Sequence, residues 1–433
     1  MAHPHRKIRV IFLLFYFEAW DSLAGIYSGM LESNDFEPIV ATIPRKLTGA
    51  TTYGDENLVH DFLENAGIEH IRLNGPDHEA EAARLKDLAP DYVFLSYPWQ
   101  RNYPPAFRPD KLAAFTRICY VPYFTAPLVD DANDIAPGTQ VAGHLFEQRM
   151  HQLASLVFVQ DEVTRQAFMT TPRGADHVFA FGSPKLDSLR VEYANALDAV
   201  QTTKPKRIRK ATRSLLWAPH HSYSTAWLAF GRFGTDYRLM LNLARRHPET
   251  AITLRPHPFM FGTLVDRGVL AADELESWIQ EFSSLPNCAI EASTPFAVQF
   301  AQHDDLLTDG ISFLAEYPLL TSRPAYFIEN QDHWPFNSAG LLAEACNYKV
   351  KSIDEFEELW LANGRGAENS TKRDFADAIK ALRAEIDPNA GTVSSLIIKA
   401  VRDHYAEGVP LVNPTQVTEL PWEDRPGREP RDD

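Results

Sequence analysis

The sequence predicts an α/β protein built from two doubly wound parallel sheets, and three observations support this prediction. Short apolar runs alternate with longer helical segments along the chain, which is typical of repeated strand–helix units. The alternation begins again after a stretch rich in lysine and arginine near residues 204–213. The chain has 433 residues, which is too long for one hydrophobic core and suits two or three domains.

The first half of the chain contains apolar runs that we expect to be strands. The run at 9–17 is continuously apolar, as expected for a strand that is covered on both faces of a parallel sheet. Helical segments separate the runs. The expected strands lie at 9–17, 38–43, 69–73, 92–95, 117–121, 156–159 and 178–181, and the expected helices at 23–31, 57–66, 79–88 and 145–154.

The second half repeats the same design. We expect an N-terminal domain at 1–205, a second domain at 206–407 and a proline- and charge-rich tail at 408–433, of which 421–433 is expected to be loosely ordered. One of the late helices is a candidate for crossing back to the first domain. The expected strands lie at 214–217, 251–254, 289–291, 306–308 and 325–328, and the expected helices at 236–246, 273–282, 296–301, 312–320, 353–362, 372–386 and 392–405.

The composition is that of an ordinary globular protein in water, with 45% apolar and 23% charged residues. The formal net charge of −16 argues against nonspecific binding to nucleic acid or to anionic lipid, because both need a basic surface. The basic residues between 204 and 213 are interpreted as a solvated linker. The sequence therefore predicts no nucleic-acid partner.

Cysteine usage indicates a reducing compartment. Cys119, Cys288 and Cys346 are widely spaced and odd in number, so the sequence predicts neither a disulfide framework nor a CxxC metal site. The apolar run at 8–17 is too short to span a bilayer and lacks a cleavage site, so we interpret it as a core strand. A cytoplasmic location is expected, with any membrane association peripheral.

Three expected strands of the second half run into polar residues suited to an anion. The strand at 214–217 is followed by Pro219-His220-His221-Ser222, and the strand at 251–254 by Arg255-Pro256-His257-Pro258. The third strand runs into Thr308-Asp309-Gly310-Ile311-Ser312. Because the carboxyl ends of parallel strands meet at one edge of the sheet, we expect these segments to form one ligand site.

The histidines are candidates for general base and phosphate contact, since imidazole titrates nearest neutrality. His220 and His221 are adjacent, so they are not expected to do the same work. Arg255 is expected to be either an anion ligand or a structural anchor, and His257 either a phosphate contact or an acid–base group.

The segment from Thr308 to Glu316 predicts a strand, a tight glycine turn and a helix start. Backbone amides at such a start bind phosphate, and Gly310 would permit close approach. Alternatively, Asp309 and Ser312 only cap the helix. Glu316 could reach a ribose hydroxyl or could be a surface carboxylate. The spacings of a dinucleotide fingerprint and of a P-loop are missing.

In the first domain, residues near strand ends are candidates for binding an acceptor. They are Glu18, Trp20, Asp21, Tyr97 and Tyr123. Their position at the carboxyl ends of strands would turn them toward a cleft between two domains. The aromatic residues could instead belong to the core. Lys185, near the domain junction, is a further candidate for phosphate contact.

Five ordered motifs between residues 118 and 317 resemble the CDP-glycerol glycerophosphotransferase-like proteins, which are related to teichoic acid polymerases and capsule-polymer transferases. The resemblance does not cover the segment after about residue 408. It implies a GT-B fold, in which two Rossmann-type domains face a central cleft. The motifs are Ile118-Cys119-Tyr120-Val121-Pro122-Tyr123, Phe181-Gly182-Ser183-Pro184-Lys185-Leu186-Asp187, Trp217-Ala218-Pro219-His220-His221-Ser222, Arg255-Pro256-His257-Pro258 and Asp309-Gly310-Ile311-Ser312-Phe313-Leu314-Ala315-Glu316-Tyr317.

This resemblance implies transfer of a polyol phosphate, glycerol phosphate first among them, from a CDP-activated donor to a hydroxyl of a polysaccharide or lipid-linked acceptor. It implies no cofactor beyond the CDP-activated substrate. His257 matches a donor-phosphate histidine of the family, and the stretch 309–312 matches its pyrophosphate-binding helix start.

The chain departs from the family pattern in the first domain. Teichoic acid polymerases carry a His-Gly-Thr-Pro motif there, with the histidine as the proposed base, whereas this chain has Tyr123-Phe124-Thr125-Ala126-Pro127. We therefore assign the base to His220 or His221. Two alternatives stay open: a GT-B glycosyltransferase that uses a nucleotide sugar, and an inactive homologue that binds nucleotides or polymer ends.

Overall fold

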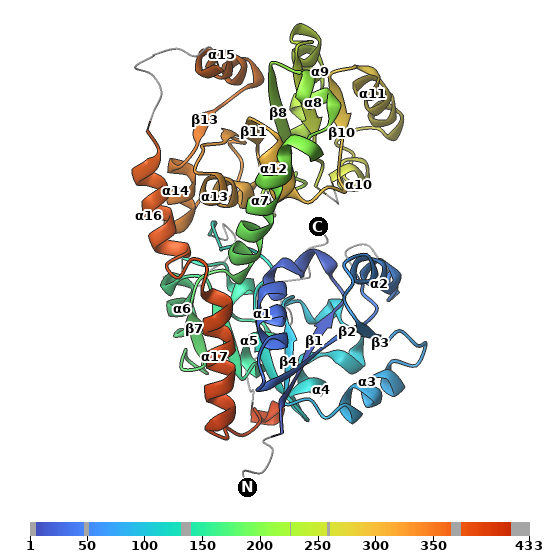
Figure 1. The fold of residues 1–433 in the computed structure, drawn as a ribbon, viewed down its shortest axis with the longest axis vertical. Coiled ribbons are helices and arrows are strands. Elements are labelled where there is room, and N and C mark those ends of the chain that lie inside the picture. The colour runs from blue at the N-terminus through green and yellow to red at the C-terminus, as the bar shows by residue number, and fades with distance from the viewer. Residues whose placement is uncertain are drawn as a thin grey trace. The chain divides into compact units, whose positions relative to one another are not determined.

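A computed structural model describes residues 6–46, 52–130, 140–225, 227–257, 260–364 and 374–416. They form two compact α/β units (Figure 1). Within these residues, unit 1 comprises 6–127, 140–188 and 386–416, and unit 2 comprises 128–130 and 189–385.

Unit 1 is built on a seven-stranded sheet with the order β3-β2-β1-β4-β5-β6-β7, and all its neighbouring strands pair in parallel. The central strand β1 is buried along almost its whole length, as its apolar sequence predicts. The strands are β1 (Ile8–Leu14), β2 (Phe36–Thr42), β3 (His70–Arg72), β4 (Tyr92–Leu95), β5 (Arg117–Tyr120), β6 (Leu156–Val159) and β7 (Val178–Ala180).

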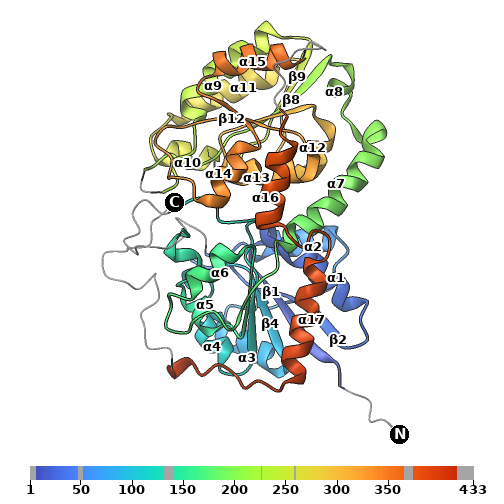
Figure 2. The same ribbon diagram turned by 90° about the vertical axis from the view of Figure 1, so that its left-hand side faces the viewer.

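Helices cover both faces of this sheet, and the last helix of the chain, α17, lies beside α1 (Figures 1 and 2). Small residues permit that contact: a Cβ on Gly25 would lie 2.6 Å from Ser394 Oγ, and one on Gly29 2.6 Å from Ile398 Cδ1. The helices are α1 (Asp21–Leu31), α2 (Glu56–Asn65), α3 (His78–Asp87), α4 (Pro109–Ala113), α5 (Arg149–Leu153), α6 (Glu162–Phe168) and α17 (Val393–Ala406), with short 3₁₀ turns at Phe17–Ala19, Gln100–Asn102, Pro105–Phe107, Gly143–Leu145 and Pro414–Gln416. A further helix, α7 (Pro184–Thr203), begins in unit 1 and continues into unit 2.

Unit 2 is built on a six-stranded parallel sheet with the order β10-β9-β8-β11-β12-β13. Its strands are β8 (Arg213–Ala218), β9 (Thr250–Leu254), β10 (Cys288–Ile290), β11 (Asp305–Thr308), β12 (Tyr326–Ile328) and β13 (Tyr348–Val350). Its helices are α8 (Lys206–Lys210), α9 (Phe233–Arg246), α10 (Met260–Asp266), α11 (Ala272–Ser284), α12 (Phe296–Gln302), α13 (Ile311–Thr321), α14 (Ser338–Ala345), α15 (Ile353–Gly364) and α16 (Ala376–Ile386).

In each sheet, the order of the strands reverses at one position. The reversal lies between β1 and β4 in unit 1 and between β8 and β11 in unit 2. The two loops that leave such neighbouring strands turn to opposite faces of the sheet, which opens a crevice at the carboxyl ends of the strands. The predicted fold class, two parallel Rossmann-like sheets, is therefore confirmed.

The division into units differs from the expected boundary at 205/206. It falls inside α7, between Ser188 and Leu189, because Leu189 packs in the core of unit 2. The expected second domain, 206–407, also loses its last helix: the apolar face of α17 is buried in the core of unit 1. The late helix that was a candidate for crossing back to the first domain is therefore α17.

The start of the expected tail, 408–433, is attached to unit 1. The guanidinium of Arg117 donates to the carbonyl of Val409, with N···O distances of 2.6 and 2.9 Å, and Val412 packs against the core. Residues 417–433 of the tail lie outside the described residues.

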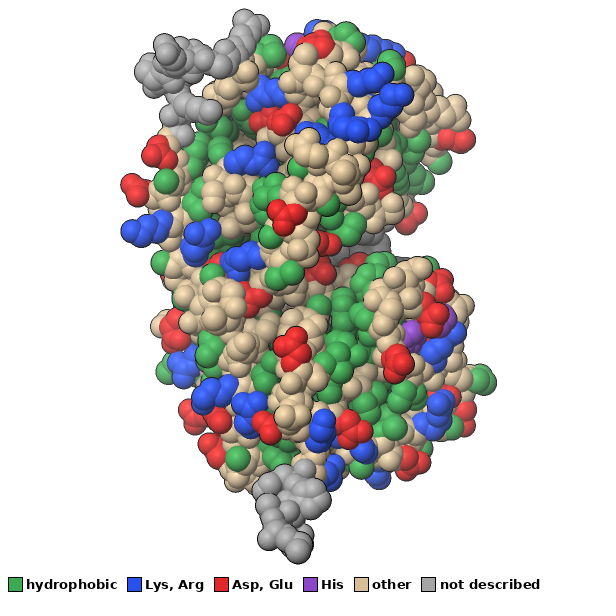
Figure 3. Space-filling model, viewed as in Figure 1, with side chains coloured by type: hydrophobic (Ala, Val, Ile, Leu, Met, Phe, Trp, Pro, Cys, Tyr) green, Lys and Arg blue, Asp and Glu red, His purple; other side chains and the backbone are tan. Residues whose placement is uncertain are grey.

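The surface of the described residues is mixed in charge. Figure 3 shows lysine and arginine side chains interspersed with acidic ones on the face in view. Among the residues that the structure describes, none of the helices combines the length and the apolarity needed to cross a bilayer.

Candidate functional site

Three neighbouring strands of unit 2 deliver the predicted site residues to one edge of the sheet. β8 lies between β9 and β11, with Trp217 in register with Leu254 and Ala218 with Thr308. Because all three strands are parallel, the segments that follow them leave the sheet at the same edge. These are the segments that carry Pro219 to Ser222, Arg255 to His257 and Asp309 to Ser312, so the structure brings the predicted segments together.

The three histidine rings form a cluster. The rings of His221 and His257 are stacked, with centroids 3.9 Å apart and planes 18° from parallel. His220 lies 4.5 Å from His221 and 5.6 Å from His257, measured between ring centroids. The rings of the adjacent residues His220 and His221 therefore lie close together and do not point to opposite sides, as they would on an extended strand. The reason is that β8 ends at Ala218, so the backbone here is not extended by sheet pairing.

His220 is held in one tautomer by Ser222. The backbone N–H of Ser222 points at Nδ1 of His220 from 3.2 Å, and the Ser222 hydroxyl lies 2.8 Å from the same nitrogen. That hydroxyl accepts from the backbone N–H of Phe230, so its own proton is directed toward Nδ1. Nδ1 is thus an acceptor, and the neutral ring carries its proton on Nε2.

Asp309 joins two segments through its carboxylate. Its Oδ1 accepts from the backbone N–H of His220 and its Oδ2 from that of Arg232, both at 2.5 Å. Burial raises the pKa of Asp309 to about 8, and the two backbone donors oppose that rise. The carboxylate is used by these two amides, so the alternative in which Asp309 merely caps helix α13 is wrong.

The start of α13 is open beside the histidines. Its N-cap is Gly310, which has no side chain to cap the helix, and Ser312 is exposed in the first turn. A Cβ on Gly310 would lie 3.5 Å from Cδ2 of His220 and 3.3 Å from Oγ1 of Thr308, so glycine keeps this position clear. Backbone amides at a helix start attract anions because the helix dipole adds to their own.

Burial keeps the histidine cluster neutral. It lowers the pKa of His221 to about 4 and holds the pKa values of His220 and His257 well below the usual range, with the neighbouring rings adding to the effect for these two. An anionic ligand beside the rings would raise all three pKa values, because a nearby negative charge favours imidazolium.

Arg255 makes the contacts of a structural anchor. Its guanidinium donates to the carbonyl of Thr294 at 2.5 Å and to Oε1 of Gln299 at 2.8 Å, and it lies over the ring of Phe296. Glu316 is fully buried in α13, so its interpretation as a surface carboxylate is wrong; its charge helps to stabilise the protonated form of Arg255. Phosphate contact by Arg255 and ribose contact by Glu316 stay predictions.

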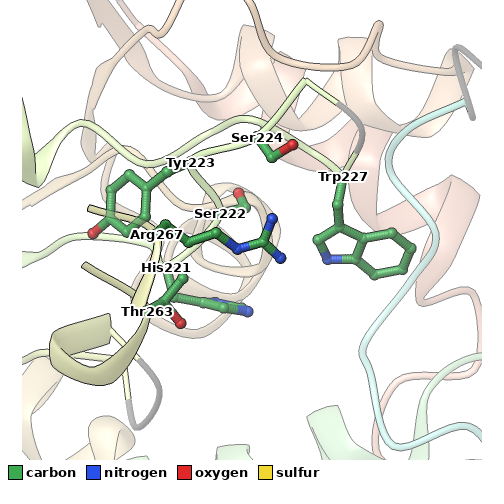
Figure 4. A pocket seen from close by; sticks show the side chains of 7 residues that line it. All are labelled: His221, Ser222, Tyr223, Ser224, Trp227, Thr263 and Arg267. Carbon is green, nitrogen blue, oxygen red and sulfur yellow. The ribbon is translucent and has the colours of Figure 1, made fainter. Parts of the chain in front are cut away.

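A small pocket beside the cluster contains residues that the sequence analysis missed. Figure 4 shows the guanidinium of Arg267 lying among Ser222, His221 and the indole of Trp227. The pocket is lined by His221, Ser222, Tyr223, Ser224, Trp227, Thr263 and Arg267. Arg267 follows α10, far from the histidines in sequence, and no spacing or motif pointed to it.

The loop that carries Trp227 has a strained backbone. Leu228 and Ala229 have positive φ angles of 58° and 53°, a region that costs non-glycine residues about 1 to 3 kcal/mol each. Trp334 holds the loop in place: its backbone N–H donates to the carbonyl of Leu228 and its indole N–H to that of Thr225, both at 3.0 Å. Such strain is retained where the surrounding structure enforces it, as at many binding sites.

The candidates for acceptor binding in unit 1 differ in how far they are buried and in the side chains they contact. Trp20 is buried and packs against Tyr27, so it belongs to the core, as the sequence analysis allowed for the aromatic residues. Tyr97 and Tyr123 are partly exposed, and their ring centroids lie 5.1 Å apart. Glu18 pairs with Arg45 at 3.4 Å.

The two remaining predicted site residues also belong to unit 1. Asp21 is the first residue of α1, and Lys185 lies in the first turn of α7. A role for Lys185 in binding phosphate stays a prediction. Within the described parts of the chain, none of the groups of three or more His, Cys, Asp or Glu side chains is arranged to hold a metal ion.

Comparison with solved structures identifies the fold. The UDP-GlcNAc 2-epimerase from Neisseria meningitidis, bound to UDP-GlcNAc, matches with a TM-score of 0.58 and 14% identity over 91% of this chain and 100% of that one. MnaA from S. aureus with UDP matches with a TM-score of 0.57 and 13% identity over 93% and 98%. The wall teichoic acid polymerase TagF, soaked with CDPG, matches with a TM-score of 0.56 and 16% identity over 92% and 89%.

Comparisons of the sequence itself gave a different result. No protein-family model matches it, and neither does any curated protein. The likeness to the solved structures thus lies in the fold and not in the sequence. The chain has the GT-B-like fold that the UDP-GlcNAc 2-epimerases and TagF share.

Proposed function

We propose that the chain is a transferase that moves a polyol phosphate from a CDP-activated donor to a hydroxyl group and releases CMP. Glycerol phosphate is the proposed group, and a cell-surface polysaccharide or a lipid-linked molecule the proposed acceptor. The fold shared with TagF supports this proposal, as do the sequence motifs that resemble the CDP-glycerol glycerophosphotransferase-like proteins.

The observation that carries the proposal is the histidine cluster beside the open start of α13. Both lie at the position where the strand order of the unit 2 sheet reverses, which is where nucleotide ligands bind in open α/β sheets. A diphosphate there would meet helix amides on one side and imidazole N–H groups on the other. Arg267 adds a cation at the nearby pocket.

His221 is the proposed base, and His220 is the proposed phosphate contact. The tautomer of His220 directs its proton to Nε2, so the neutral ring donates a hydrogen bond and cannot accept a proton at that atom. His221 is neutral at pH 7 in the ligand-free chain, because its pKa is near 4. The negative charge of the bound donor would raise that pKa toward the range in which a histidine base works well.

In the proposed step, the acceptor hydroxyl oxygen attacks the β-phosphorus of the donor. A new oxygen–phosphorus bond forms, the bond to the CMP oxygen breaks, and the hydroxyl proton passes to the imidazole of His221. His220 Nε2–H, the amides at the start of α13 and Arg267 would stabilise the charge on the phosphate oxygens and on departing CMP.

The test is to incubate the full chain with CDP-glycerol and a hydroxyl acceptor, and in parallel with UDP-GlcNAc. CMP release that depends on the acceptor would support the proposal. UDP release from UDP-GlcNAc with sugar transfer would instead indicate a glycosyltransferase, and conversion of UDP-GlcNAc to its 2-epimer would indicate the activity named for the similar epimerase structures. Binding of nucleotides without turnover of any donor would favour the inactive homologue.

A further inference from the structure

Unit 1 buries three polar side chains that each contain at least one hydrogen-bonding atom without a partner. Tyr120, Gln148 and His151 are each 0% exposed. The hydroxyl of Tyr120, both amide atoms of Gln148 and Nε2 of His151 make no hydrogen bond. A buried polar atom left unpaired destabilises the folded chain, so the fold keeps this cluster at a cost in stability.

His151 is fixed in one form. The backbone N–H of Gln148 donates to its Nδ1 at 3.1 Å, so the neutral ring carries its proton on Nε2. Burial lowers the pKa of His151 to about 3, and hence the ring stays neutral at working pH. His151 therefore offers a hydrogen-bond donor and is not a base.

The cluster lies beside the tyrosines at the carboxyl ends of the strands in unit 1. Tyr120 ends β5, and its ring centroid lies 4.7 Å from that of His151. Burial raises the pKa of Tyr120, and the nearby Tyr123 and Tyr97 add to that rise. Tyr16 completes the layer, at 5.2 Å from Tyr97 and 5.7 Å from Tyr123 between ring centroids. Tyr16, Tyr97 and Tyr123 follow β1, β4 and β5, respectively. The order of the strands in the sheet reverses between β1 and β4.

The chemistry of the cluster points to hydroxyl groups. A phenol, a carboxamide and a neutral imidazole offer both donors and acceptors without a charge. A hydroxyl of a sugar or polyol both donates and accepts, and aromatic rings are suited to the apolar faces of such molecules. An ionised ligand would instead call for charged partners.

We propose that Tyr120, Gln148 and His151, together with the layer of Tyr16, Tyr97 and Tyr123, form a subsite that binds a sugar or polyol unit through its hydroxyl groups. That this ligand is the acceptor of the reaction rests on the proposed transferase function. The binding of a sugar or polyol at this subsite does not depend on that function. The three polar residues are covered in the ligand-free chain, whereas the three tyrosines are partly exposed. Binding therefore requires the side chains that cover these three residues to move.

Two substitutions separate this role from a structural one. Gln148→Met removes the amide and keeps a side chain of similar length, and Tyr120→Phe removes only the hydroxyl. Because the removed atoms have no partner in the free chain, both variants are expected to be at least as stable as the wild type in urea unfolding. The matched control is Gln166→Met, at an exposed position on α6.

The experiment measures binding of oligosaccharides of glucose and of N-acetylglucosamine, and of glycerol and ribitol, to the full chain by ligand-observed NMR without donor. We expect at least one probe to bind the wild type and the Gln166→Met control equally, and to bind Gln148→Met and Tyr120→Phe about tenfold more weakly, as expected for one or two lost hydrogen bonds. No binding of any probe, or equal binding by all four proteins, would overturn the proposal and leave the cluster as a site for buried water.

A second readout distinguishes failure of the subsite from failure of the proposed function. If the chain releases CMP from CDP-glycerol, Gln148→Met should raise the KM for the acceptor, whereas the Gln166→Met control should leave that KM unchanged. If the chain never releases CMP, the transferase proposal fails while the binding result still decides the subsite.

Discussion

His221 stacks on His257 with ring centroids 3.9 Å apart, and both rings lie within 6 Å of His220. Three rings this close cannot all be protonated, because like charges repel strongly in a buried site. A cluster of this kind is suited to hold a single proton. One imidazole would gain that proton while an anion is bound and lose it when the product dissociates. The three positions should therefore differ in their effects when they are replaced.

Replacement of His221 should affect turnover, and replacement of His220 should affect donor binding. His221→Asn is expected to lower kcat for CMP release by about 100- to 10,000-fold, the usual contribution of a positioned base. His220→Asn, which loses the Nε2–H donor, should raise the KM for the donor by about tenfold with a smaller change in kcat. Steady-state kinetics with CDP-glycerol measures both values. An unchanged kcat in His221→Asn would remove this residue from the role of base.

Stability should fall as the pH is lowered, because buried neutral histidines gain protons on unfolding. His303 is a case outside the site: it lies 2.7 Å from the hydroxyl of Thr253, and burial lowers its pKa to about 4. The unfolded chain binds a proton at about pH 6.5 and the folded chain only near pH 4. Between these values, His303 costs the wild type about 1.4 kcal/mol of stability per pH unit.

The variant His303→Gln isolates the contribution of His303 to the pH dependence of stability. His303→Gln is expected to be less stable than the wild type at pH 7.5, since it disturbs the contact with Thr253. The gap between the two proteins should shrink as the pH falls from 6.5 to 4. Urea unfolding of both proteins at pH 7.5, 6.0 and 5.0 measures the difference in their free energies of unfolding. A gap that stays constant would contradict the low pKa of His303.

Asp309 should contribute to stability through its two amide partners. Asp309→Ala leaves the backbone N–H groups of His220 and Arg232 without their acceptor, and a loss of about 1 to 3 kcal/mol in the free energy of unfolding is expected. Asp266→Ala, at an exposed position at the end of α10, is the matched control and should change stability by less than about 0.5 kcal/mol. Equal stability of the two variants would show that the amides find other partners.

Arg267 should bind the donor through charge. Arg267→Met keeps much of the side-chain length and removes the guanidinium, so it is expected to weaken binding of CDP-glycerol by about tenfold at low salt. The difference from the wild type should narrow as salt is added, because ions screen a partly exposed charge. Isothermal titration at two salt concentrations measures this. A difference that does not depend on salt would indicate a packing role for Arg267.

The fold and the main segments of the site could be predicted from the sequence for a simple physical reason. Strands of a buried parallel sheet are continuously apolar, and polar residues directly after them must lie at its carboxyl edge. Short elements were harder to predict. The strand Tyr348–Val350 was missed because it is only three residues long and only Val350 is fully buried, so it leaves little pattern to detect.

The contacts that define the roles in the site could not be predicted. The pairing of Asp309 with Arg232 joins residues 77 positions apart through a backbone amide, which any residue type provides. Arg267 lines the pocket from the position directly after α10, about 45 residues along the chain from His221, and no sequence pattern links the two. The unpaired state of Gln148 and Tyr120 is visible only once the packing around them is known.

Gly310 provides a test that separates ligand binding from folding. Its φ is −89°, so alanine can adopt the backbone, and the new Cβ would lie 3.3 Å from Oγ1 of Thr308 and 3.5 Å from His220. Gly310→Ala should therefore fold with a small change in stability, while its methyl group fills the space that a phosphate needs beside the helix amides. A drop of about tenfold in affinity for CDP-glycerol is expected.

The control for that substitution is Gly262→Ala in α10, where a Cβ would meet nothing within 4 Å. It should stabilise the chain by about 0.5 to 1 kcal/mol, because alanine favours the helix, and should leave donor binding unchanged. If Gly310→Ala binds the donor as tightly as Gly262→Ala does, the phosphates do not approach the start of α13. The diphosphate would then have to be held by the histidines and Arg267 alone.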